Sequence, residues 1–147
     1  KDARIVLDYL HELRPSDYFL YRIEVAYWQA VGDLEQTVHW FGQAAEAGVT
    51  VPQRLAMRSQ LADFYFAQKM WAEAKKSYQE ALHFDNSNVV LWHKLSIVHW
   101  QLEDIDEAEK CNQQTLRLKD FPAARQLEEQ IKSKKSGGGL LGKLFGG

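Results

Sequence analysis

The sequence predicts an all-α fold, and three observations support this prediction. Three glycines and three prolines lie among the first 135 of the 147 residues, whereas six glycines lie in the last twelve. A stretch so poor in helix-breaking residues is typical of helices joined by short turns. Apolar residues recur along it at the three- and four-residue spacing of amphipathic helices, and the period-two alternation that indicates strands is absent.

Each of eight expected helices, about 12–16 residues long, is identified by its own apolar stripe. Pro15, the turn at Gly32 and Asp33, and the loop at residues 47–52 separate the first four helices, and Ser16 or Asp17 is placed to cap the second. The stripes of the first four are, in chain order, Ala3, Val6, Leu7, Leu10 and Leu13; Leu20, Ile23, Tyr27 and Trp28; Leu34, Val38, Phe41, Ala44 and Ala45; and Leu55, Leu61, Ala62 and Tyr65. Those of the last four are Trp71, Ala74, Tyr78, Ala81 and Leu82; Leu91, Trp92, Leu95 and Val98; Ile105, Ala108, Leu116 and Leu118; and Ala123, Leu127 and Ile131.

The stripes repeat at a nearly fixed period. The set Ala3, Leu7, Leu10 recurs 34 positions later as Thr37, Phe41, Ala44, then 37 later as Ala74, Tyr78, Ala81, and 34 later again as Ala108, Asn112, Thr115. The first helices of successive pairs repeat as well, since Arg58, Leu61, Ala62 and Tyr65 map onto Trp92, Leu95, Ser96 and His99. A period in this range is the signature of stacked structural repeats.

These residues resemble the tetratricopeptide repeat, whose pattern is W-x2-L-G-x2-Y, then A-x3-F, then P. The resemblance covers about residues 1–120 and implies a right-handed α-solenoid of stacked antiparallel helix pairs. It divides the chain into a half-repeat at 1–14, repeats at 18–51, 55–88 and 89–120, a polar capping helix at 121–135 and a flexible tail at 136–147. The departures are Glu24 and Val25, where Leu and a small residue are expected, and Asn112 and Thr115, which predict a less tightly packed closing pair.

The half-repeat at 1–14 is expected to leave part of its apolar face uncovered. A repeat buries its apolar face against its neighbours, so Ile5, Tyr9 and Leu13 are expected to be partly uncovered. We expect further repeats upstream in a longer parent protein.

Composition argues against several function classes. The net charge of −2 gives no electrostatic basis for nucleic-acid binding. The lone Cys111 excludes an intramolecular disulfide framework, and the five histidines lack the i, i+4 spacing of helical metal ligands. No nucleophile, phosphate-binding or dinucleotide-binding motif occurs. We therefore expect no cofactor, no metal site and no catalytic activity.

The resemblance also implies where a partner binds, because the first helices of such repeats line a concave groove that usually takes an extended peptide or a helix. A carboxylate ligand, which some family members clamp with cations and amides, is disfavoured here by Asp63. Of the tryptophans, Trp28, Trp40, Trp71 and Trp92 lie on packing stripes, and Trp100 is expected to face a partner; Phe66 and Trp100 could equally pack between repeats. The groove positions proposed for partner contact are Phe19, Arg22, Gln29, Ser59, Asp63, Phe66, His93, Ile97 and Trp100.

The function expected from these features is a non-catalytic scaffold or adaptor that binds a protein partner, with a cytoplasmic location favoured. The alternatives are a chaperone for secretion or assembly subunits, or a regulatory region of a larger enzymatic or membrane-anchored protein.

The tail forms a separate hypothesis. Its apolar residues fall on one face at 100° per residue, opposite Lys143, and suggest a recognition peptide that enters a groove of a partner or of another copy. Weak membrane attachment and an inert end are the alternatives, and self-association through the tail or the half-repeat remains open. The residues of this motif are Leu140, Leu141, Leu144 and Phe145.

Overall fold

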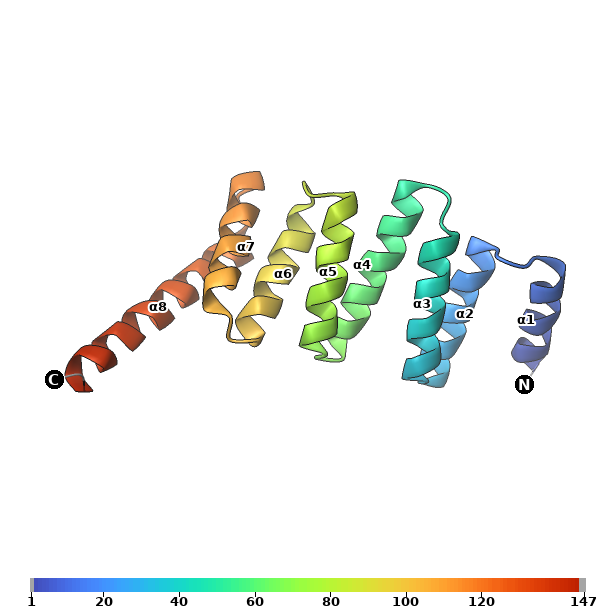
Figure 1. The fold of residues 1–147 in the computed structure, drawn as a ribbon, viewed down its shortest axis with the longest axis horizontal. Coiled ribbons are helices and arrows are strands. Elements are labelled where there is room, and N and C mark those ends of the chain that lie inside the picture. The colour runs from blue at the N-terminus through green and yellow to red at the C-terminus, as the bar shows by residue number, and fades with distance from the viewer. Residues whose placement is uncertain (1, 146–147) are drawn as a thin grey trace. The chain divides into compact units, whose positions relative to one another are not determined.

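The computed structural model describes the backbone of residues 2–145 and the side chains of residues 2–137. Within these residues the chain forms eight helices and no strand (Figure 1), which confirms the all-α prediction. The helices are α1 (Asp2–Leu13), α2 (Tyr18–Val31), α3 (Leu34–Ala47), α4 (Val51–Ala67), α5 (Trp71–Phe84), α6 (Val89–Gln101), α7 (Ile105–Leu118) and α8 (Pro122–Phe145). They form two compact units, an N-terminal unit of residues 1–64 and a C-terminal unit of residues 65–147, and the division falls within α4.

Side-chain caps fix where the helices begin. The Asp17 carboxylate accepts hydrogen bonds from the backbone N–H groups of Phe19 and Leu20 at 2.8 and 3.1 Å, so Asp17 rather than Ser16 caps α2. The Asn88 side chain caps α6 in the same way. Such caps satisfy N–H groups that have no partner inside the helix.

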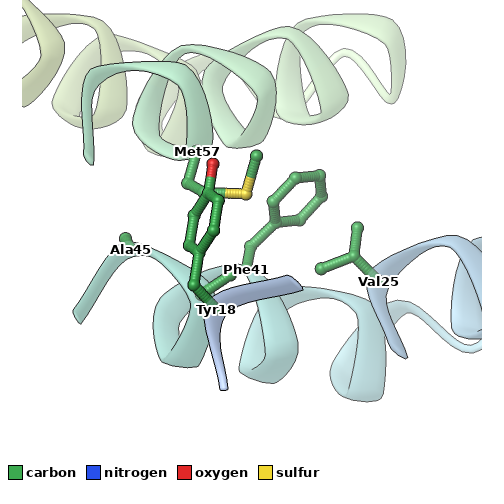
Figure 2. Close-up of a cluster of buried hydrophobic side chains, with 6 residues drawn as sticks. Tyr18, Val25, Phe41, Ala45 and Met57 are labelled. Carbon is green, nitrogen blue, oxygen red and sulfur yellow. The ribbon is translucent and has the colours of Figure 1, made fainter. Parts of the chain in front are cut away.

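The positions that repeat in the sequence form the core of each unit. In the N-terminal unit, Phe41 of α3 and Met57 of α4 point toward each other beside Tyr18 and Val25 of α2 (Figure 2). In the C-terminal unit the matching Ala74, Tyr78, Ala81 and Ala108 are fully buried. All nine residues of the three full second-helix sets are at most 2% exposed, so the 34-residue period predicted the packing.

Asn112 and Thr115 differ from the expectation of a looser closing pair. Both are buried, and the Asn112 amide Nδ2 donates to the Ala124 carbonyl of α8 at 2.9 Å, while Thr115 Oγ1 donates to the Cys111 carbonyl at 3.0 Å. Asn112 therefore joins α7 to the following helix, and Thr115 satisfies a carbonyl within α7, so neither residue leaves a gap.

Glu24, the other departure from the repeat pattern, is completely buried and links α1 to α2. Arg4 donates to both of its oxygens at 2.7 and 2.8 Å, His11 Nε2 lies 2.8 Å from Oε1, and Trp28 Nε1 donates to Oε2 at 3.0 Å. Burial by itself would raise the pKa of Glu24, but the hydrogen bonds from Arg4 and His11 outweigh it and hold the pKa below its ordinary value.

The opposite face of α1 is uncovered, as the sequence analysis expects. Ile5, Tyr9 and Leu13 are each more than half exposed, and so is Val6, which the apolar stripe places in the packing surface. The apolar stripe predicted that Val6 packs against α2. The pairs that Arg4 and His11 form with Glu24 determine instead which face of α1 meets α2.

Helix α8 continues past residue 135, where the sequence analysis ends the capping helix and begins a flexible tail. No proline follows Pro122, and each glycine costs a helix about 1 kcal/mol without terminating it. Lys135 at this boundary is ion-paired with Asp106 and Glu109 of α7. The side chains of the proposed motif Leu140, Leu141, Leu144 and Phe145 lie outside the described side chains.

Candidate functional site

In the N-terminal unit, three of the predicted groove residues line one pocket. Phe19, Arg22 and Gln29 project from α2 into a pocket of about 430 Å³ that α4 closes with Met57 and Gln60. Asp17 caps α2, and the helical spacing within α2 places positions 19, 22, 26 and 29 on one side. We call this the α2 pocket; Ile23, Val25 and Ala26 complete its lining.

The α2 pocket combines exposed apolar surface with one cation. Phe19 is 63% exposed and Ile23 is 51% exposed, which is unusual for large apolar side chains on a packed helix. The Arg22 guanidinium lies 5.8 Å from the centre of the Tyr18 ring, a cation–π contact that orients it. Among the residues that the structure describes, Arg22 forms no ion pair. The pocket can therefore accept an apolar group together with a carboxylate or carbonyl oxygen.

Ile23 and Met57 were missed as pocket residues by the sequence analysis. Ile23 was placed on the packing side of its helix, and this was wrong, because its side chain is half exposed and lines the pocket. The signal that could have found it is its i, i+4 spacing from Phe19. Met57 is 1% exposed and belongs to the core as well as to the pocket floor.

Ser59 and Asp63 of α4 do not line the α2 pocket. Ser59 is half-buried and Asp63 is exposed. Their proposed contact with a partner stays a prediction.

The four predicted groove residues of the C-terminal unit are engaged in packing. Phe66 meets the rings of Trp71 and Tyr78 edge-on, with centroids 5.3 and 6.3 Å apart. His93 is 9% exposed and lies edge-on to Phe121 at 4.8 Å. Burial lowers the pKa of His93, which favours the neutral ring.

Trp100 is half-buried, and its contact with a partner stays a prediction. Together with Ile97 it packs against Ala108 of α7 and against Leu127 and Ile131 of α8, and Lys134 Nζ lies 5.1 Å from its ring centre. The sequence analysis did not predict this packing, because the pattern of a single helix does not show which later helix packs against it.

The described part of the chain contains neither a metal-binding cluster nor a membrane-spanning helix. No group of three or more His, Cys, Asp or Glu side chains there is arranged to hold a metal ion. No helix there combines the length and the apolar character needed to cross a membrane.

Comparison with known proteins gives matches to one family. Residues 65–131 match the sequence profile of the tetratricopeptide repeat. No curated protein sequence matches the chain significantly. Among solved structures, the first tetratricopeptide-repeat domain of Spaghetti (RPAP3), bound to the HSP90 peptide SRMEEVD, is similar, with 16% identity, a TM-score of 0.66, and coverage of 81% of this chain and 93% of that one.

The first such domain of human RPAP3 gives a similar result. Its structure, determined by NMR, has 16% identity, a TM-score of 0.64, and coverage of 84% of this chain and 96% of that one. At this identity the likeness concerns the fold, and it agrees with the fold class that the internal period predicts.

Proposed function

We propose that this chain, whose residues 65–131 match the tetratricopeptide repeat, is a non-catalytic adaptor that binds a short segment of a partner protein. The α2 pocket is the observation that supports this proposal. It offers exposed Phe19 and Ile23 beside the cation of Arg22, and arginine and aromatic residues dominate binding energy at protein interfaces.

The chemistry of the pocket defines the preferred ligand. Burying one apolar side chain against Phe19, Ile23 and Met57 contributes about 25 cal/mol of binding free energy for each Å² of apolar surface removed from water. Arg22 adds a charge-assisted hydrogen bond to an acceptor placed next to that side chain. The preferred segment is a peptide in which a large apolar residue stands beside Asp or Glu.

The HSP90 peptide bound by the Spaghetti domain suggests the class of ligand, a short peptide, and nothing finer. Asp63 disfavours a ligand whose terminal carboxylate lies beside α4.

A peptide display experiment tests the proposal. Random seven-residue peptides are selected on the whole chain, and the best is measured by fluorescence polarisation against the parent, Arg22→Glu and Phe19→Ala. Each substitution is expected to weaken binding by about tenfold or more, the range of an interface hot spot. Arg117→Glu is the matched control, because Arg117 is an exposed arginine of α7 outside the α2 pocket.

Two results would overturn the proposal. One is a selection that enriches no peptide. The other is equal binding by the parent and Arg22→Glu while Arg117→Glu weakens binding.

A further inference from the structure

A second pocket lies in the C-terminal unit, on a different side of α6 from the predicted groove. It has a volume of about 610 Å³ and is lined by side chains of α5, α6 and α7. On α6 the lining residues are Trp92, Leu95 and His99. At 100° per residue these lie about 130° around the helix from His93, Ile97 and Trp100. This α6 pocket is therefore independent of the function proposed for the α2 pocket.

The floor of the α6 pocket is apolar. Leu82, Leu95 and Cys111 line it and are each less than 10% exposed. Burial raises the pKa of the Cys111 thiol to about 11, so the sulfur stays protonated and behaves as a small apolar group. Sulfur atoms and leucine side chains both pack well against aromatic rings.

Trp92 provides a fixed flat wall. Its indole Nε1 donates to the Asn86 carbonyl at 2.8 Å, so the ring is held in one orientation at the edge of the pocket. An incoming ring can stack on it or meet it edge-on, the two geometries that aromatic pairs prefer.

The polar groups of the α6 pocket carry little unpaired charge. Burial lowers the pKa of His99 in spite of the nearby Asp104 carboxylate, which favours a neutral ring at pH 7. His99 Nδ1 is buried and makes no hydrogen bond in the described part of the chain, and the Asp104 carboxylate oxygen Oδ2 lies 3.4 Å from it. Glu107, the carboxylate of the lining, is ion-paired with Lys110. Gln79 at the rim adds an amide that can donate and accept.

From these features we propose that the α6 pocket binds an uncharged aromatic ring that carries a hydrogen-bonding group. The leucines, the thiol and Trp92 receive the ring, and Gln79 and His99 receive its polar group. An anionic ring is disfavoured because the lining contains the Glu107 carboxylate and no lysine or arginine that could receive the negative charge. The volume is within the range of about 300–1,000 Å³ that small-ligand pockets occupy. The ring can belong to a free small molecule or to a Trp or Tyr side chain of a protein, since both present the same chemistry.

Titration by NMR tests this inference on the whole chain. The indole N–H signal of Trp92 is followed while benzamide or benzoate, a neutral and an anionic ring of the same size, is added. Benzamide is expected to shift the signal saturably with a dissociation constant of about 1 mM or below. Benzoate is expected to bind at least about tenfold more weakly.

A blocking variant and its control locate the site. Gln79→Trp places a large side chain at the exposed rim and is expected to weaken benzamide binding by about tenfold or more. Gln43→Trp, the same change at an exposed position of α3, is expected to leave binding unchanged. Indole and N-acetyltryptophan amide then distinguish the source of the ring: tighter binding of the amide supports a protein side chain, and tighter binding of indole supports a free molecule.

The inference is overturned if benzamide causes no saturable shift up to about 10 mM, if benzoate binds as tightly, or if Gln79→Trp binds benzamide like the parent.

Discussion

The buried Glu24 carboxylate holds α1 onto the N-terminal unit, and replacing it with the isosteric amide is expected to loosen α1 selectively. In Glu24→Gln one oxygen is retained, but an NH₂ group then faces the donors of Arg4, and the charge-assisted bonds to Arg4 and His11 lose their acceptor charge. Hydrogen bonds to charged groups contribute about 1.5–3 kcal/mol each.

The surroundings of Arg4 offset part of the free energy lost with these three bonds. Its side chain is 27% exposed and also pairs with Asp8, so it can be solvated when Glu24 is neutralised. We therefore expect a net cost of about 2 kcal/mol, which corresponds to about thirtyfold in an equilibrium constant.

Hydrogen exchange measures this cost locally. In Glu24→Gln the backbone amides of α1 are expected to exchange about thirtyfold faster, whereas those of α3 change little. Glu12→Gln is the matched control, because Glu12 is an exposed carboxylate on the same helix. Unchanged exchange in α1, or an equal effect of Glu12→Gln, would refute the assignment of Glu24 as the attachment of this helix.

Three further predictions concern the titration of Glu24, the titration of His93 and His99, and the Asn112 hydrogen bond. Since the pKa of Glu24 is lowered in the fold, the unfolded chain binds more protons in acid, so the attachment of α1 is complete above about pH 5 and weakens as the pH falls below about 4. Exchange of the α1 amides between pH 6 and 3.5, corrected for intrinsic rates, measures this. Exchange in Glu24→Gln should not show the pH dependence. Since burial lowers the pKa of both His93 and His99, unfolding takes up protons below about pH 6.5; the melting temperature should fall between pH 7 and 5, and a pH-independent melting temperature would contradict this. Asn112→Ala removes the donor to the Ala124 carbonyl and should destabilise the contact between α7 and α8 by about 1–3 kcal/mol. Faster amide exchange at residues 124–131 measures this loss. Gln113→Ala is the control, because Gln113 is exposed on the same helix.

The sequence predicted the core because the repeat constrains it strongly. Phe41, Tyr78 and Ala108 occupy equivalent positions in successive second helices and are all buried, which the 34-residue period required. A period of this kind averages over many residues, so a few departures do not obscure it.

The environment of individual side chains was less predictable. Ile23 has the spacing of a core position, yet it is exposed. Trp100 was predicted to face a partner, and it packs in part against α7 and α8. Their exposure depends on which neighbouring helix covers them, and this is a property of packing rather than of the helix that carries them. Glu24 could have been recognised, since an acidic residue at a buried repeat position requires donors such as Arg4.

Mapping the selected peptide onto the chain tests the central claim most directly. When that peptide is added to isotope-labelled protein, the largest NMR shifts are expected at Phe19, Arg22 and the Met57 methyl group, which line one pocket. Shifts confined to the C-terminal unit, with these three signals unmoved, would contradict the assignment of the α2 pocket as the partner-binding site.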